Sequence, residues 1–470
     1  MTPATRTETD SFGPIEVPAD ALWGAQTARS LRFFAIGEQA MPVPVVHAIA
    51  WVKWAAAGVN HTLGLLDGER ARAIADAAQA VAEGRHDREF PLSVWQTGSG
   101  TQSHMNVNEV VARLATRSLE AAAGQAVPRV HPNDEVNLGQ SSNDVFPTAM
   151  HLAVALQSDR LLMPALRALQ ATLLAKARAF AGCVKIGRTH LQDATPVTLG
   201  QEFGAHAAQL QACEVTIRQS LAAVHALAIG GTAVGAGLNT HPAFGARVAA
   251  QLAGRFGLPF VQADNLFAAL AGHEALVAFH GGLKMLAIAL TKIGNDIRLM
   301  GSGPRAGLGE LRLPANEPGS SIMPGKVNPT QVEALTMVCI QVMANDLAVG
   351  LAASQGQFEL NVYKPLIAAD LLDSLEWLTD AVASFTTHCV AGLQPEREHL
   401  REAMARSLML VTALVPHIGY ERAAAIATHA QATGLGLRAA ALAVAGLEAA
   451  QFDAWVDPAR MLGPTVEPGR

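Results

Sequence analysis

Apolar residues recur at three- and four-residue spacing along most of the chain, the pattern of helices that bury one face. The clearest run extends from about residue 147 to residue 181, and its apolar positions are Met150, Val154, Leu161, Leu162, Leu166, Leu169 and Leu173. Pro164 lies inside this run and should kink or split the helix, because proline has no backbone N–H to donate. The same spacing predicts helices near residues 45–63, 67–83, 107–123, 195–229, 265–300, 329–353 and 361–391.

The two ends of the chain have other patterns. Residues 1–50 are punctuated by Gly13-Pro14 and Pro18, so we expect them to be largely irregular. After Pro395 the predicted helices become shorter. We therefore predict a mainly α protein with a mostly helical N-terminal domain (residues 1–140), a central domain of long helices (residues 141–395) and a small helical C-terminal domain (residues 396–470).

Composition narrows the function classes. Half of the residues are apolar and only 16% are charged, which favours close-packed helices that associate into oligomers. The net charge is −6 and the basic residues are scattered, which excludes a nucleic-acid footprint. Residues 1–10 are polar, unlike a secretory signal, and polar residues interrupt the most apolar stretches, 265–300 and 335–353. We expect a soluble, cytoplasmic protein without membrane spans.

The four cysteines indicate no metal site or disulfide framework. Cys183, Cys213, Cys339 and Cys389 are far apart in the sequence and form no C-x-x-C pair. We predict that they are reduced and serve in packing.

The densest polar stretch is Gly319-Ser-Ser-Ile-Met-Pro-Gly-Lys-Val-Asn-Pro-Thr-Gln-Val-Glu333. It offers a hydroxyl pair, a lysine and an amide just before a helix. Asn328 is predicted to cap that helix, with Pro329 as its first residue and Gln331 as the capping partner. Free N–H groups at the helix start, together with Lys326, would bind an anion such as a carboxylate. The alternative is a surface loop that happens to carry a lysine.

Three further polar loops, at residues 99–101, 141–143 and 189–190, also precede predicted long helices. Each offers small hydroxyls, an amide or a histidine where backbone N–H groups are free. If these helix ends meet, inside one subunit or between subunits, they form a pocket for a small polyanion. The glycine-rich stretch 230–237 lacks the spacing of a nucleotide loop, so we interpret it as a turn between helices.

The four loops resemble the aspartase/fumarase superfamily, and within it the class II fumarases. The stretch Gly319-Ser-Ser-Ile-Met-Pro-Gly-Lys-Val-Asn-Pro329 is similar to the superfamily signature, and similarity extends from Ala21-Leu-Trp-Gly to Met461-Leu-Gly. The stretch Gly-Arg-Thr-His190-Leu-Gln-Asp is fumarase-like, since aspartases typically carry Gln at the histidine. Gly-Ser-Gly-Thr101 and Ser-Ser-Asn143 are fumarase-like as well.

The resemblance implies a fold and a reaction. The fold would be three-domain and mainly α, with a central long-helix bundle that assembles into the helical core of a homotetramer. Each active site would take residues from three subunits. The reaction would be the reversible hydration of fumarate to (S)-malate in the tricarboxylic acid cycle, through an aci-carboxylate intermediate. It would need no metal or organic cofactor.

The resemblance also implies roles for individual residues. Ser320 would be the base, as an alkoxide stabilised by loop N–H groups, and His190, oriented by Glu333, would handle the water or hydroxyl. The substrate-binding residues would be Ser99, Gly100, Thr101, Ser141, Ser142, Asn143, Thr189, Ser321, Lys326, Val327 and Asn328. A second anion site would consist of His131, Pro132, Asn133 and Asp134.

Several alternatives stay open. Ser99, Ser141 and Ser142 could act as helix caps, and Glu333 could be a solvated helix residue. His104 stands where relatives commonly have Asn. Rival functions are an aspartate ammonia-lyase, another lyase of the superfamily, and a catalytically silent helical tetramer.

Overall fold

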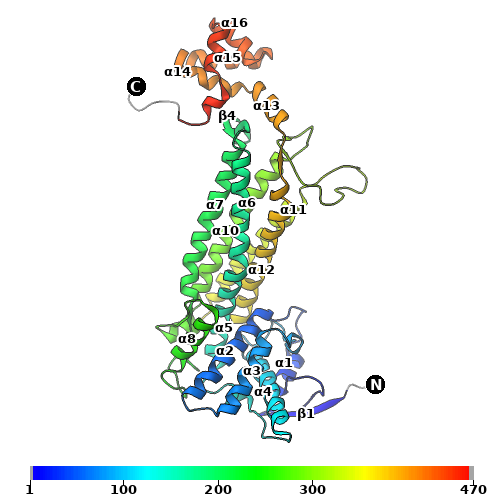
Figure 1. Cartoon of the computed structure of the whole chain (residues 1–470), viewed down its shortest axis with the longest axis vertical. Helices are drawn as coiled ribbons and strands as arrows, with labels where there is room; N and C mark the ends of the chain where they lie inside the picture. The colour runs from blue at the N-terminus through cyan, green and yellow to red at the C-terminus, as the bar shows by residue number, and fades with distance from the viewer. Residues whose placement is uncertain (1–3, 465–470) are drawn as a thin grey trace. The chain divides into compact units, whose positions relative to one another are not determined.

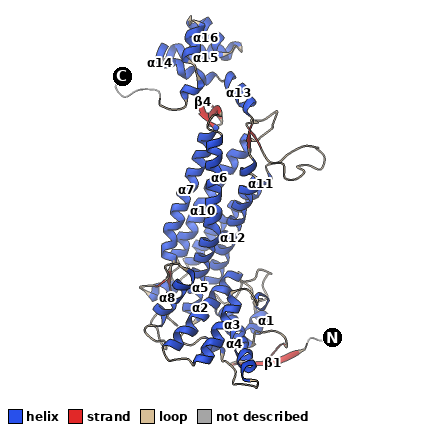
Figure 2. Ribbon diagram, viewed as in Figure 1, coloured by secondary structure: helices blue, strands red, loops and turns tan. Residues whose placement is uncertain are grey.

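The computed structural model describes residues 4–464, and helices dominate it (Figures 1 and 2). The predicted mainly α class is confirmed. The end residues of the predicted N- and C-terminal domains, 1–3 and 465–470, lie outside the described part. The α-helices are α1 (Ala25–Phe33), α2 (Val43–Thr62), α3 (Gly68–Ala82), α4 (Thr101–Ala123), α5 (Ser142–Gln157), α6 (Met163–Ala179), α7 (Leu199–Val224), α8 (Phe244–Phe256), α9 (Leu266–Ala271), α10 (Glu274–Met300), α11 (Thr330–Ala353), α12 (Lys364–His388), α13 (Arg397–Arg406), α14 (Val415–Ile418), α15 (Tyr420–Thr433), α16 (Leu437–Ala445) and α17 (Ala449–Trp455).

The strands are short and pair in twos: β1 (Thr5–Asp10) with β2 (Gly13–Pro18), β3 (Val184–Thr189) with β4 (Gln192–Thr198), β5 (Ala226–Leu227) with β6 (Val261–Gln262), and β7 (Leu311–Arg312) with β8 (Gln394–Pro395). The β1–β2 hairpin and α1 correct the prediction that residues 1–50 are largely irregular. The β3–β4 hairpin delays the helix predicted from residue 195, which begins at Leu199. Strands therefore form connections and not a core.

The helix predicted over residues 147–181 is split as expected. α5 ends at Gln157, a π-helical turn (Ser158–Leu162) follows, and α6 begins at Met163. Pro164 has no N–H for the carbonyl of Arg160, four residues earlier, so regular α-helical bonding cannot continue there.

The chain divides into two compact units. The first holds residues 1–164, 213–287 and 338–380, and the second holds residues 165–212, 288–337 and 381–470. In the first unit α2 packs on α3, α5 and α8. Its Trp51 is edge-to-face with Phe256 at the end of α8, with ring centroids 5.4 Å apart. Segments of α10, α11 and α12 also meet in this unit, since His280 contacts both Asp346 and Ser374.

The second unit has its own helix contacts and its own core. Here Gly294 of α10 packs against Val332 of α11, and Gln331 of α11 accepts a hydrogen bond from Ser384 of α12. Another cluster of buried side chains joins β3 to the C-terminal helices: Ile186, Met404, Leu410, Val411, Leu414, Ala423, Ile426, Ala430, Leu437, Ala440, Ala441, Leu447 and Phe452.

Candidate active site

The first polar loop is shaped by a glycine that leads into α4. Gly100 has a φ of +76°, and a Cβ atom there would lie 2.2 Å from Cδ2 of Phe146 in α5. Only glycine combines this backbone conformation with this close approach. On either side of it, the Ser99 and Thr101 hydroxyls are 2.8 Å apart. The loop therefore presents two adjacent hydroxyl groups at the start of a helix.

The second loop begins α5 with a capping box. The Ser141 hydroxyl accepts from the Asn143 N–H, and the Asp144 carboxylate accepts from the Ser141 N–H at 2.9 Å. Asp144 also accepts from the N–H groups of Gly230 and Thr232, both at 3.0 Å. Burial raises the pKa of this carboxyl group, and its backbone hydrogen bonds oppose that shift. Ser141 therefore caps α5, and its substrate contact stays a prediction.

The Gly230–Gly237 stretch closes against this loop. The Asn143 amide donates to the carbonyl of Ala233 at 2.8 Å. The stretch forms turns between the two-residue strand β5 and α8, so the prediction of a turn is confirmed. Its preceding element is a short strand rather than the predicted helix.

Two residues that sequence reasoning did not place in the site join the two loops. His104 is fully buried on α4, and its Nδ1 lies 2.7 Å from the Ser142 hydroxyl. Its Nε2 lies 2.6 Å from Nζ of Lys53, which is fully buried on α2. The available signal was Lys53 itself, the one Lys, Arg, Asp or Glu within the apolar run Val43–Gly58. Ser142 is thus a hydrogen-bonding partner of a buried histidine, and not a helix cap.

The third loop is a tight hairpin turn and does not directly precede a helix. Thr189 pairs with Gln192, so His190 and Leu191 alone connect β3 to β4. Both have left-handed backbone, with φ of 56° and 62°. Side chains other than Gly, Asn and Asp rarely adopt this conformation, and such strain concentrates at functional sites. The turn leaves Thr189 and His190 exposed.

Buried charges fix the base of that hairpin. Lys185 on β3 donates to Glu202 at 2.7 Å and lies 2.9 Å from Glu310. Arg188, next to Thr189, donates to the other oxygen of Glu310 at 2.7 Å. Burial raises the pKa of the Glu202 carboxyl group, against the opposing effect of Lys185. These ion pairs therefore hold β3, and with it the strained turn, in place.

The fourth loop surrounds Ser320 with backbone donors. The Ser320 hydroxyl oxygen accepts from the N–H groups of Ile322 at 3.3 Å and Met323 at 3.1 Å. Gly319 donates to the carbonyl of Lys326 at 3.1 Å, and a Cβ atom on Gly319 would lie 2.1 Å from that oxygen. Ser321, Lys326 and Val327 are exposed. The Gly319–Lys326 hydrogen bond therefore closes the loop, and two of its backbone N–H groups point at the Ser320 oxygen.

The predicted capping at this loop is wrong. α11 begins at Thr330, and the Asn328 amide donates to the carbonyl of Gly319 instead of capping the helix. Gln331 accepts from Ser384 and does not reach back to Asn328. The loop needs Asn328 for its own closure, and this bond competes with the cap. Glu333 is exposed in the first turn of α11, and among residues 4–464 it has no hydrogen bond to His190.

The candidate residues thus form separate groups. The loops at 99–101 and 141–143 meet through His104 in the first compact unit, whereas Thr189, His190 and the 319–333 stretch belong to the second. Across residues 4–464, no three His, Cys, Asp or Glu side chains converge as ligands for a metal ion.

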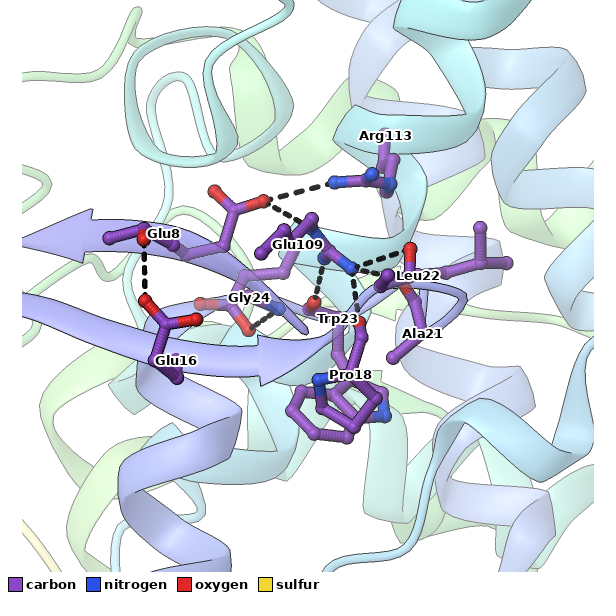
Figure 3. A network of polar contacts seen from close by, with 12 residues as sticks. Glu8, Glu16, Pro18, Ala21, Leu22, Trp23, Gly24, Glu109 and Arg113 are labelled. Atoms are coloured by element: carbon purple, nitrogen blue, oxygen red, sulfur yellow. Dashed lines mark hydrogen bonds and ion pairs between the residues drawn. The ribbon is translucent and has the colours of Figure 1, made fainter. Parts of the chain in front are cut away.

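The predicted second anion site borders a cavity of about 660 Å³ that is also lined by Arg117 and Arg129. His131 accepts the Asp134 N–H at its Nδ1 at the start of a π-helical turn (Pro132–Val136). In the same cavity Glu8 pairs with Arg113 at 3.0 Å and Glu109 accepts from the Gly24 N–H at 2.8 Å (Figure 3).

Comparison with known proteins identifies the family. Residues 13–344 match the family described as lyase, and residues 410–463 match the family described as the fumarase C C-terminus. A class II fumarate hydratase of Chromobacterium violaceum is 61% identical over 464 residues, which cover 98% of this chain and 100% of that relative. The chain belongs to the class II fumarate hydratases. A second member, from Thermosynechococcus vestitus, is 58% identical over 98% of this chain and 99% of that relative.

Solved structures agree with this class II fumarate hydratase fold. A class II fumarase from Schistosoma mansoni superposes with a TM-score of 0.95 at 46% identity, over 98% of this chain and 100% of that one. A fumarate lyase:delta crystallin from Brucella melitensis gives a TM-score of 0.93 at 42% identity, with the same coverage. The aspartase/fumarase fold expected from the loops is confirmed, and so is the enzyme class, a hydro-lyase.

α10 and α11 are long and apolar enough to span a membrane by length and composition alone. Core helices of soluble proteins pass the same test.

Proposed function

We propose that this chain catalyses the reversible, stereospecific hydration of fumarate to (S)-malate, as its relatives' name implies. The observation that carries the mechanism is the pair of backbone N–H groups donated to the Ser320 hydroxyl oxygen. Removing a proton next to a carboxylate needs a strong base. Donors aimed at an oxygen stabilise its ionised form, so they favour Ser320 as an alkoxide.

In the malate-to-fumarate direction, Ser320 removes a proton from the carbon next to a carboxylate. The electron pair moves into that carboxylate and gives an aci-carboxylate with an extra negative charge. Lys326 and Asn328 bind this group, with the hydroxyls and amides of the other loops around the rest of the substrate. The C–O bond of the hydroxyl group then breaks, and His190 protonates the departing oxygen as water. Hydration is the reverse sequence.

We propose that the loop groups meet between copies of the chain in a homotetramer, so that each active site takes residues from several subunits. Support comes from α11, where Ile340, Leu347 and Leu351 are 62%, 66% and 59% exposed at helical spacing. An apolar stripe of this length is typical of a helix that another copy covers. We expect light scattering to give a particle of four times 49.1 kDa. A monomer with full activity would overturn the shared site.

Five further assignments accompany this proposal. The enzyme works in the tricarboxylic acid cycle and in the cytoplasm, and its chain has the three domains 1–140, 141–395 and 396–470. Glu333 orients His190 from a neighbouring subunit, which agrees with the exposure of both side chains. The residues His131 to Asp134 bind a second anion, to which the adjacent Arg129, with a side chain 79% exposed, is accessible.

The decisive assay follows the ultraviolet absorbance of the fumarate double bond with purified protein and a chelator. We expect the absorbance to rise with (S)-malate and not with L-aspartate. A rise with aspartate would indicate an ammonia-lyase, which position 190 disfavours because it holds histidine. No rise with either acid would overturn the proposed reaction.

A further inference from the structure

A buried lysine in the first compact unit has three hydrogen-bonding partners. Lys53 Nζ is 2.9 Å from Oδ1 of Asn137, 2.9 Å from Oε1 of Gln140 and 2.6 Å from Nε2 of His104. The side chain of Lys53 is fully buried. Each of its hydrogen-bonding positions is therefore used inside the protein.

The orientation of the two amides is fixed independently of Lys53. The Asn137 amide nitrogen donates to the carbonyl of Gln140 at 3.2 Å. The Gln140 amide nitrogen donates to the carbonyls of Val136 and Leu138, both at 3.2 Å. Because both nitrogens face backbone carbonyls, both amide oxygens face Lys53. Lys53 must donate to each of them.

The third partner decides the state of His104. Lys53 and His104 are in contact and buried, so they cannot both be cationic. An amine is about four pKa units more basic than an imidazole, so a single shared proton resides on the amine. The buried Asp144 carboxylate attracts that charge and opposes the lowering of the Lys53 pKa by burial. An ammonium group has three hydrogens and no lone pair, so Nε2 of His104 must accept.

The consequence reaches the proposed substrate site. With Nε2 accepting, the neutral imidazole carries its hydrogen on Nδ1, which lies 2.7 Å from the Ser142 hydroxyl oxygen. Ser142 therefore accepts from His104. Among residues 4–464 no group accepts the hydrogen of the Ser142 hydroxyl, and Ser142 is only partly buried. That hydrogen is available to a ligand.

We propose that Lys53 and His104 are positioning residues that hold the Ser142 hydroxyl as a hydrogen-bond donor to a substrate carboxylate. The inference rests on the proposed function, in which Ser142 binds the substrate. The opposite tautomer would turn the Ser142 hydrogen toward Nδ1 and present oxygen lone pairs to the carboxylate, which repels them. This chain of hydrogen bonds from Lys53 through His104 to Ser142, the relay, thus decides whether the Ser142 hydroxyl donates to the substrate or accepts from it.

Neutron diffraction from crystals of the full-length protein exchanged into D₂O tests the relay without reference to activity. We expect deuterium on Nδ1 of His104, none on its Nε2, and three deuterons on Nζ of Lys53. Deuterium on Nε2 with two on Nζ would overturn the proposal. This result is independent of whether fumarate is the substrate.

Kinetics of three variants test the consequence. Ser142→Ala should raise KM for fumarate about ten- to hundredfold, the effect of losing one hydrogen bond to a charged group. His104→Leu should raise KM by a comparable factor, with a smaller change in kcat. His104→Asn should cause a smaller rise, because the asparagine amide has a donor at the same position along the side chain as Nδ1. An unchanged KM in Ser142→Ala would overturn the substrate contact itself. If Ser142→Ala raises KM as expected but His104→Leu and His104→Asn raise it equally, the relay alone would be overturned.

Discussion

Lys185 Nζ lies 2.9 Å from Oε2 of Glu310, and both side chains are almost completely buried beneath the hairpin that carries His190. Within residues 4–464, Oε2 of Glu310 accepts no well-aligned hydrogen bond, so this contact is a charge–charge attraction. Removing one partner of a buried ion pair is strongly destabilising, even where the intact pair adds little net stability. The anchoring of the turn depends on this pair.

Glu310→Gln removes the negative charge between Lys185 and Arg188. We expect the free energy of unfolding to fall by about 3 kcal/mol, since Glu202 is then the one carboxylate left to compensate both Lys185 and Arg188. Urea denaturation at fixed protein concentration measures the change. The control is Glu396→Gln, whose partner Arg312 is 70% exposed, and which should change stability by less than about 0.5 kcal/mol. Equal effects of the two variants would contradict the role of burial.

Ser320→Ala removes the proposed base together with the acceptor of the Ile322 and Met323 N–H groups. We expect kcat to fall by a factor of about 10²–10⁴, the typical contribution of general-base catalysis, while the oligomer stays intact. The fumarate absorbance assay and light scattering measure the two quantities. Ser321→Ala is the neighbouring control and should reduce kcat far less. Near-normal turnover in Ser320→Ala would refute its assignment as the base.

His190→Asn keeps a polar side chain that tolerates left-handed backbone, so it separates chemistry from turn strain. We expect the rate to fall about a hundredfold or more through loss of the proton-transfer group. The pH–rate profile should lose one of its limbs. A profile of unchanged shape would argue against an acid–base role for His190.

Leu191 tests the strain in the turn. Its φ is 62° and its side chain is 71% exposed, so packing contributes little. Leu191→Val should destabilise the protein by about 1 kcal/mol relative to Leu191→Asn, because a β-branched residue is poorly tolerated at positive φ and asparagine is not. Thermal unfolding of both variants measures the difference. Identical melting temperatures would contradict a strained turn.

Asp370 on α12 makes stability depend on pH. Burial, and then the neighbouring Asp373, raises the pKa of its carboxyl group to about 6. The folded protein therefore binds this proton more tightly than the unfolded chain does, and the contribution of Asp370 to stability falls as pH rises from about 4 to about 6. Asp370→Asn should raise stability by roughly 1–2 kcal/mol at pH 8 and by less at pH 5. The exposed Asp380→Asn is the control. An equal gain at both pH values would rule out Asp370 as the titrating group.

The sequence predicted the long helices well, because apolar spacing is local information. The split near Pro164 and the start of α2 follow from residues within a few positions. The β3–β4 hairpin was missed because His190-Leu191 lacks the Asn-Gly or Asp-Gly chemistry of a two-residue turn. Buried charges hold the two strands together instead, and Glu310, which lies far along the chain, completes them.

The polar loops of the candidate site were recognisable from the sequence, whereas the buried side chains behind them were not. Ser320 and Ser142 lie in recognisable polar stretches, so their positions were accessible from the sequence. Lys53 and His104 are 51 residues apart and meet only through packing of α2 against α4. The capping role of Asn328 failed because the Gly319 carbonyl competes for its amide, a contact that no local rule contains.

The two N–H groups that point at Ser320 come from the residues two and three positions further along the chain. Ser320 and its donors therefore travel as one piece whenever the loop shifts. A substitution at Pro324, outside both this donor set and the proposed substrate contacts, should therefore leave the hydrogen bonds to the Ser320 oxygen in place.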